Sequence, residues 1–209
     1  DTCNVVSTLT DANFTGGNFL AEAGFSQGEM AAATYTIAAS EFPVTINSTE
    51  VILVTSNASQ QTVTQWSMLF YSGTPTAGSL VATYSSDDTV LPHARVGPGT
   101  AGINIQFSID PSDPEQLVIP DDGSHKITVV FRIDHHSQPP ANPCSQSPAT
   151  CCNAFPCVDT SGLQNGGANW LYGLNCGPFG CPANGGWSTF SNLNVLCRPT
   201  GDWVMRATW

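Results

Sequence analysis

The chain has 209 residues, and its 16 acidic residues outnumber its 5 basic ones, which gives a formal net charge of −11. Proteins that bind nucleic acid or anionic lipid through phosphate groups need clustered Lys and Arg, so this composition excludes both as main partners. Hydrophobic residues make up 41% of the chain, which is typical of a folded protein, and no apolar run approaches the ~20 residues of a membrane span.

Residues 1–137 have the composition of a β protein. Short runs rich in Val, Ile, Thr, Tyr and Phe alternate with turn-forming Gly, Pro, Asn and Ser, a rhythm that predicts short strands joined by tight turns. In chain order, the predicted strands cover residues 4–9, 31–38, 45–56, 62–71, 79–85, 102–109 and 125–134. Little helix is expected, with helical turns only near residues 19–23 and 28–32.

Alternation of apolar and polar residues is clearest in two of these segments. Every second residue is apolar from Ile103 to Ile109 and again from Ile127 to Ile133. Each segment therefore has one apolar face, as expected of a strand that lies with one side against a core. Many short strands of this kind predict an all-β fold, an antiparallel β-sandwich or jelly roll.

A Pro-rich stretch at residues 137–143 marks a change in composition. Beyond it lie seven cysteines and many Gly, Asn and Pro, which is typical of a loop-rich region held by disulfides. We therefore expect a β-sandwich at residues 1–137 and a Cys-rich region at residues 138–209. The tail at residues 202–209 has strand character and is expected to pair back onto the sandwich, which would make one covalent unit.

The cysteine content indicates disulfides and hence a secreted or cell-surface protein. The eight residues are Cys3, Cys144, Cys151, Cys152, Cys157, Cys176, Cys181 and Cys197. Full oxidation would require Cys3 to bond into the C-terminal region or to another molecule, because seven cysteines cannot pair among themselves. The adjacent Cys151 and Cys152 are predicted to have different partners, and Cys176 and Cys181 are the expected local pair because a turn-forming stretch lies between them.

One acidic cluster has chemistry suited to a metal ion. Asp110, Asp113 and Glu115 lie in one predicted turn and offer the oxygen ligands that Ca²⁺ prefers. Local hydrogen bonding, which commonly explains Asp in turns, is the alternative. No cofactor other than a metal ion is expected.

A second candidate metal site lies where a predicted strand ends. Asp134, His135 and His136 are consecutive there, and His93 or His125 would supply a third ligand for zinc or copper. Adjacent residues on a strand point to opposite faces, which opposes a shared metal. Two polar residues at a strand end are the alternative interpretation.

Aromatic residues gather near the C-terminus. Trp170, Tyr172 and Trp187, together with Trp203 and Trp209, all lie in the last part of the chain. Aromatic side chains exposed in this way would bind sugars by stacking, as in a carbohydrate-binding module. The alternative is that they form a small core for the loop-rich region.

Three sequons are present, at Asn13, Asn47 and Asn57. They are candidate glycosylation sites. In a chain this rich in Asn, Ser and Thr, about three such triplets are expected by chance, so their number is not an argument for glycosylation.

Several segments resemble known proteins. They include Cys151-Cys152-Asn153-Ala154-Phe155-Pro156, Asn169-Trp170-Leu171-Tyr172, Gly186-Trp187-Ser188-Thr189-Phe190 and the tail from Cys197-Arg198-Pro199-Thr200-Gly201 to Asp202-Trp203-Val204-Met205-Arg206-Ala207. These segments, with similar ones at residues 24–29, 31–37, 42–44 and 70–74, resemble uncharacterised secreted proteins of large-genome bacteria. The resemblance covers most of the chain and implies an exported, Cys-rich β-sandwich; it implies no activity.

The function expected from these observations is not enzymatic. The Gly-x-Ser-x-Gly pattern at residues 24–28 does not follow a predicted strand, as the nucleophile motif of hydrolases would, and no pair of carboxylates stands out as a glycosidase pair. With Lys126 as its single lysine, it lacks the lysines that commonly guard strand edges. We therefore expect an extracellular structural or adhesive protein that associates with itself or another protein, for example as a surface-fibre subunit. A carbohydrate-binding module is the alternative, and a metal-dependent hydrolase at His135 is a third hypothesis.

Overall fold

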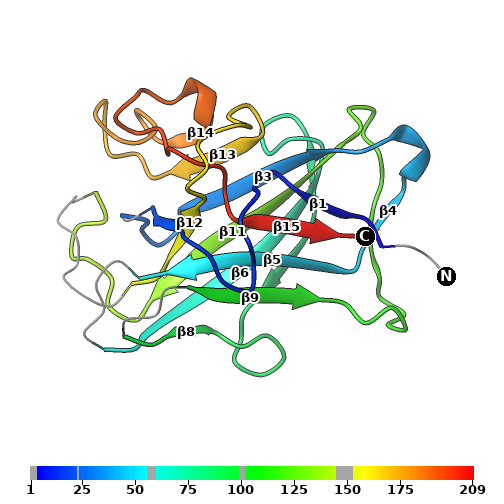
Figure 1. Cartoon of the computed structure of the whole chain (residues 1–209), viewed down its shortest axis with the longest axis horizontal. Coiled ribbons are helices and arrows are strands. Elements are labelled where there is room, and N and C mark those ends of the chain that lie inside the picture. The colour runs from blue at the N-terminus through cyan, green and yellow to red at the C-terminus, as the bar shows by residue number, and fades with distance from the viewer. Residues whose placement is uncertain (1–3, 23, 56–59, 99–101, 145–152) are drawn as a thin grey trace.

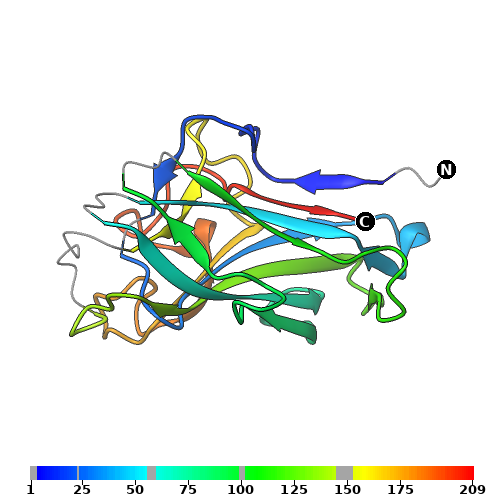
Figure 2. The ribbon, with the colours of Figure 1, turned by 90° about the horizontal axis from the view of Figure 1, so that it is seen from below.

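The computed structural model describes residues 4–22, 24–55, 60–98, 102–144 and 153–209. Within these residues the chain forms two layers of antiparallel strands, a β-sandwich (Figures 1 and 2). The all-β antiparallel fold predicted from the sequence is confirmed.

The first layer is a six-stranded sheet. Its order is β1 (Val6–Thr8), β15 (Met205–Thr208), β5 (Ser48–Val54), β12 (Phe155–Val158) and β2 (Leu20–Ala21), and β9 (Ile103–Ser108) pairs with β5. A separate ribbon consists of β4 (Val44–Ile46) and β10 (Leu117–Ile119).

The second layer is a seven-stranded sheet. Its order is β14 (Gly186–Thr189), β13 (Asn169–Gly173), β3 (Met30–Thr36), β11 (Lys126–His136), β6 (Thr62–Ser72) and β7 (Ser79–Ser85), and β8 (Ala94–Val96) pairs with β6. Two short 3-10 helices, η1 (Ala39–Glu41) and η2 (Phe190–Asn192), are the helical elements of the described residues. None of the helical structure in these residues is long and apolar enough to cross a membrane.

Most predicted strands form close to their expected bounds. β7 covers residues 79–85 as predicted, whereas the segment at 45–56 divides into β4 and β5. The helical turns expected near residues 19–23 and 28–32 are wrong, because β2 and the start of β3 occupy those positions. Pairing with β12 and β11 satisfies the backbone there, which overrides the weak local helical preference.

The main core lies between the two sheets. The apolar face predicted for β11 is confirmed, since Ile127, Val129, Phe131 and Ile133 are each at most 1% exposed. On β9, Phe107 is buried, and the other apolar residues of its alternating face pack against the core at its margin. Trp203 is fully buried in the same core.

The C-terminal part of the chain belongs to both sheets. Where the sequence predicted loops and one final strand, residues 153–209 contribute β12 and β15 to one sheet and β13 and β14 to the other. The final strand does pair back, with β5 on one side and β1 on the other. The Cys-rich region is therefore interleaved with the sandwich.

Two disulfides are present in the described residues. Cys144 bonds to Cys176, and Cys181 bonds to Cys197, so the expected local pairing of Cys176 with Cys181 is wrong. Each partner comes from a segment distant in sequence, which a local turn motif cannot indicate. Cys3, Cys151 and Cys152 lie outside the described residues.

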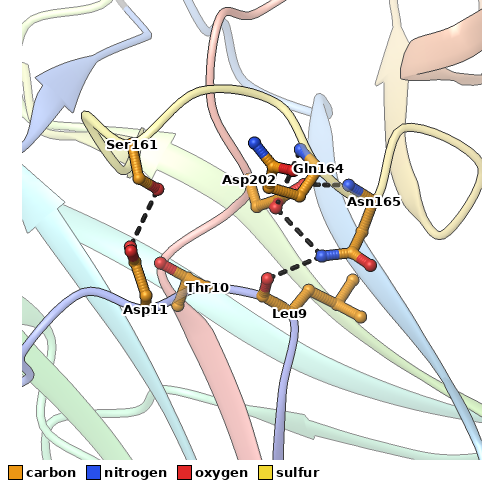
Figure 3. Close-up of a pocket in the computed structure, with 7 residues that line it drawn as sticks. All are labelled: Leu9, Thr10, Asp11, Ser161, Gln164, Asn165 and Asp202. Carbon is orange, nitrogen blue, oxygen red and sulfur yellow. Dashed lines mark hydrogen bonds between the residues drawn. The ribbon is translucent and has the colours of Figure 1, made fainter.

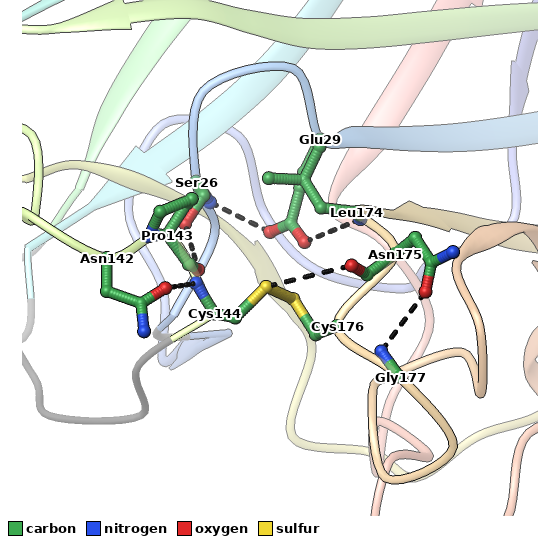
Figure 4. The surroundings of a disulfide bond; sticks show 9 residues. All are labelled: Ser26, Glu29, Asn142, Pro143, Cys144, Leu174, Asn175, Cys176 and Gly177. Atoms are coloured by element: carbon green, nitrogen blue, oxygen red, sulfur yellow. Dashed lines mark hydrogen bonds between the residues drawn. A yellow bond between two sulfur atoms is a disulfide. The ribbon is translucent and has the colours of Figure 1, made fainter.

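Hydrogen bonds around Glu29 reinforce the first disulfide (Figure 4). The Glu29 carboxylate accepts hydrogen bonds from the backbone N–H groups of Ser26 at 2.8 Å and Leu174 at 3.1 Å. The Ser26 hydroxyl donates to the carbonyl of Pro143, next to Cys144. Burial raises the pKa of Glu29, and these two backbone hydrogen bonds oppose that shift.

Cys157 carries a free, buried thiol, in contrast to the expected oxidation of all eight cysteines. Its sulfur lies 3.5 Å from the carbonyl oxygen of Ile52, within an apolar cluster on the outer side of the six-stranded sheet. Burial raises the pKa of this thiol, so it stays protonated and unreactive.

The same apolar cluster closes the outer face of the six-stranded sheet. Phe14 and Phe19, from the segment between β1 and β2, pack there against Ile52, Val54 and Val204 together with Cys157. The guanidinium of Arg206 lies 4.3 Å from the centre of the Phe14 ring. The N-terminal segment therefore covers this face.

Candidate functional site

The outer face of the seven-stranded sheet is different, because several aromatic side chains lie on it. We call it the aromatic face and define it by Met30, Ala32, Leu69, Tyr71, Val130, Trp170, Tyr172 and Trp187. On β13 the intervening Leu171 belongs to the main core, so Trp170 and Tyr172 point away from the core. The three aromatic residues singled out in the sequence are thus brought together on one face, and Trp203 is not among them.

Tyr172 and Trp187 form a cross-strand pair. They are directly opposite each other on β13 and β14, with ring centroids 5.3 Å apart and an interplanar angle of 67°. Edge-to-face packing of this kind holds both rings in place. Both side chains remain partly exposed.

Trp170 is held by a chain of hydrogen bonds that runs across three strands. Its Nε1–H donates to the hydroxyl of Thr34 at 2.9 Å, and that hydroxyl lies 2.7 Å from the hydroxyl of Thr128. Thr128 in turn donates to the carbonyl of Gly73 at 2.7 Å. Thr128 uses its single hydroxyl proton on the Gly73 carbonyl, so Thr34 donates to Thr128 and accepts from the indole N–H of Trp170.

A small residue provides the space beneath the indole. Ala32 lies opposite Trp170 in the register of β3 and β13 and is fully buried. Val130 and Leu69 continue the same row across β11 and β6, and Trp170, Met30 and Tyr71 pack against this buried row. Since both donor and apolar contacts fix the ring, its orientation is set before any ligand binds.

A polar cluster borders the apolar row. It consists of Ser67 on β6, Ser85 on β7, and Arg132 and Asp134 on β11. Arg132 Nε donates to Asp134 Oδ1 at 2.6 Å, and the buried Ser67 hydroxyl donates to Asp134 Oδ2. Arg132 is opposite Met30 on one side and Ser67 on the other, so the cluster adjoins the aromatic face directly.

The histidines do not combine into a metal site. His136 is fully buried, and its ring nitrogens lie 3.3 Å from the Thr64 hydroxyl and 3.2 Å from the Phe25 carbonyl. His135 is exposed, and Asp134 is bonded to Arg132. His93 is hydrogen-bonded to the Ser86 hydroxyl.

The acidic turn uses its carboxylates locally. Asp110 accepts a hydrogen bond from the Ser112 N–H, and Asp113 accepts one from the Glu115 N–H, both at 2.8 Å. Across the described part of the chain, no group of three or more His, Cys, Asp or Glu is placed to hold a metal ion. The structure thus does not assemble Asp110, Asp113 and Glu115 into a ligand set.

Two of the three sequons can be located. The Asn13 side chain is exposed but accepts hydrogen bonds from the backbone and hydroxyl of Thr15. The Asn47 amide donates to the Asn4 side chain, and Asn57 lies outside the described residues.

A pocket of about 450 Å³ lies at the start of the 202–209 tail (Figure 3). Its lining consists of Leu9, Thr10, Asp11, Ser161, Gln164, Asn165 and Asp202. The Asp202 carboxylate accepts from the backbone N–H of Asn165 at 2.9 Å and from the Asn169 amide at 2.6 Å. Asp202 therefore organises the loop before β13, and its carboxylate is engaged in structure.

No protein-family model, curated protein or solved structure matches this chain.

Proposed function

We propose that the protein is a secreted glycan-binding protein and that the aromatic face is its binding surface. The observation that supports this most strongly is the presentation of Trp170, Tyr172 and Trp187 on one face of a rigid sheet. Sugar rings have apolar C–H faces that pack on aromatic rings, and large rigid rings bury area at little cost in conformational entropy. The two disulfides are typical of proteins from oxidising compartments.

The alternative interpretation is that the C-terminal aromatic residues form a core. It describes a different tryptophan, Trp203. Trp203 is fully buried in the main core, whereas Trp170 and Trp187 pack on a separate outer cluster and stay partly exposed. The hydrogen-bond chain through Thr34 pre-orients Trp170. Pre-orientation reduces the entropy lost on binding.

Binding to a panel of polysaccharides tests the proposal. Affinity gel electrophoresis or pull-down with cellulose, chitin, xylan, mannan, galactan and dextran should identify at least one ligand, accompanied by a change in tryptophan fluorescence. Trp187→Ala should weaken that binding about tenfold, which corresponds to about 1.4 kcal/mol. Thr34→Val should weaken it less, because the Trp170 ring remains but loses its hydrogen-bond acceptor.

Trp209→Ala is the matched control. Trp209 is also partly buried, but it lies at the end of the six-stranded sheet, where its backbone pairs with Val5. This variant should bind as the parent protein does. Equal binding by Trp187→Ala and the parent protein, or the failure of every polysaccharide to bind, would contradict the proposal.

Self-association as a structural or adhesive subunit is a second candidate, supported by the edge strand β7. β7 lies at the end of the seven-stranded sheet and contains no charged residue, and its Leu80 and Val81 are 52% and 37% exposed. Unprotected edges of this kind pair with other strands. Light scattering and electron microscopy should then show polymers that Leu80→Lys abolishes; a parent protein that stays monomeric at high concentration would reject this function.

A further inference from the structure

We infer that the ligand of the aromatic face is an uncharged polysaccharide. Its hydroxyl groups are recognised by Ser85, Arg132 and Asp134 of the polar cluster, which the buried Ser67 holds in place. This inference rests on the proposed function and adds the chemical class of the glycan. The side chains of the cluster are held in fixed positions on the sheet. The Ser67 side chain is fully buried, and Arg132 and Asp134 are partly shielded, with side chains 32% and 24% exposed.

The directions of the hydrogen bonds show what the cluster still offers. Ser67 donates to Asp134, so the Ser85 hydroxyl, 2.7 Å away, donates to Ser67 and its oxygen keeps room to accept. Each oxygen of Asp134 accepts one bond within the cluster and can accept a second. Arg132 uses Nε and Nη2, while its Nη1 makes no hydrogen bond to any described residue.

The cluster therefore presents donors and acceptors side by side. A sugar hydroxyl both donates and accepts, so neighbouring hydroxyls can satisfy Arg132 and Asp134 together. A carboxylate, sulfate or phosphate group only accepts hydrogen bonds and would leave Asp134 facing a like charge. The mixed polarity of the cluster favours hydroxyls over anionic groups.

The distribution of charge leads to the same ligand class. Arg132 is neutralised by Asp134. The other cation on this side of β11 is Lys126, the first residue of the strand, which lies six residues before Arg132 and about 20 Å away. Residues 160–201, which carry Trp170, Tyr172 and Trp187, contain a single charged residue, Arg198. The net charge of −11 would repel a polyanion.

The spacing of the strands indicates that the ligand is a chain of linked sugars rather than a single sugar. Trp170 lies on β13 and Arg132 on β11, with β3 between them, so two inter-strand steps of about 5 Å separate their backbones. A ligand that stacks on Trp170 and also reaches Arg132 must span about 10 Å across the strands. That length requires linked sugar units lying across the sheet.

Matched neutral and anionic polymers test the inference. The intact protein is compared on the neutral panel given above and on carboxymethylcellulose, polygalacturonate, alginate and hyaluronan. We expect binding to a neutral polymer that changes less than twofold when NaCl is raised to about 0.5 M, because screening affects only charge-driven binding. Carboxymethylcellulose should bind at least tenfold more weakly than neutral cellulose if cellulose is the ligand.

Two arginine variants separate the polar cluster from a general effect of charge. Arg132→Gln should weaken neutral-polymer binding at least fivefold, whereas Arg95→Gln should not change it, because Arg95 is an exposed arginine on β8 paired with Asp88. Preferential, salt-sensitive binding to the anionic polymers, or unchanged binding by a folded Arg132→Gln, would overturn the inference and leave the proposed function intact. Binding to neither class of polymer would overturn both.

Discussion

A single extra residue in β11 decides which side chains reach each face of the strand. The pairing register with β6 shifts between Ile133 and His135, which leaves Asp134 as a β-bulge. Continued alternation from Ile133 would direct His135 inward and His136 outward. Instead His136 is buried and His135 is exposed, while Asp134 keeps the outer position that alternation gives it, beside Arg132.

The buried histidine makes stability depend on pH. Desolvation lowers the pKa of His136 from 6.5 to about 4, so between these values the unfolded chain binds a proton that the folded chain does not. The free energy of unfolding therefore falls as the pH falls from about 6.5 to 4, by about 3 kcal/mol in total. Urea unfolding at several pH values should show that His136→Gln lacks this component.

Glu22 changes the free energy of unfolding with pH in the opposite direction and so provides a control. Burial raises its pKa from 4.5 to about 7, so the stability it contributes is present below pH 4.5 and is lost as the pH rises through about 7. Glu22→Gln should make the fall in stability at low pH steeper than in the parent protein. A His136→Gln variant with the same pH dependence as the parent would show that His136 is protonated in the folded chain.

Among the elements, β1 forms one edge of the six-stranded sheet. It pairs with β15 in the same chain, the backbones of Val5 and Trp209 exchange hydrogen bonds of 2.8 and 3.1 Å, and Thr8 donates to the Met205 carbonyl. In this structure β1 therefore completes its own sheet and shields one edge of β15.

Deletion of residues 4–9 tests this role. It removes the β1–β15 hydrogen bonds and the packing of Leu9 against the core, and the free energy of unfolding should fall by about 2–4 kcal/mol. Urea unfolding and size-exclusion chromatography measure stability and oligomeric state together. If the deletion instead left stability unchanged and dissolved an oligomer, β1 would pair with a neighbouring molecule.

At the scale of the whole molecule, the two disulfides connect segments that the sheets hold only in part. Cys144–Cys176 joins the segment after β11 to the loop after β13 across 32 residues, and Cys181–Cys197 closes 16 residues around β14 and η2. In the chain-entropy picture a longer closed loop gives more stabilisation.

Paired serine variants compare the two bridges. Cys144→Ser with Cys176→Ser should lower the free energy of unfolding by about 4 kcal/mol, and Cys181→Ser with Cys197→Ser by about 3 kcal/mol, as measured by urea unfolding. The Glu29 and Ser26 hydrogen bonds remain in the first variant, so its folded structure should persist. The reverse order of stabilities would show that native-state contacts outweigh loop entropy.

The sequence by itself determined the features that depend on local pattern. Alternation marks the buried face of β11. A strand that packs one side against a core has an apolar residue at every second position, because successive side chains point to opposite faces. The same rule places Trp170 and Tyr172 on one side of a strand, although the sequence did not indicate that a strand was present there. The composition and cysteine content predicted the all-β class and the disulfides, and the three aromatic residues of the proposed site were named from their clustering alone.

The tertiary structure decided everything that depends on contacts between distant segments. Cys176 bonds to Cys144 instead of the nearby Cys181 because sheet pairing brings β11 and β13 to either side of β3. The polar cluster of Ser67, Arg132 and Asp134 arises from the register that places Arg132 opposite Ser67, and this register has no local signature. Likewise, which sheet face stays open depends on where the segment with Phe14 folds, because the six-stranded sheet is covered by that segment and the aromatic face is formed by its own strands.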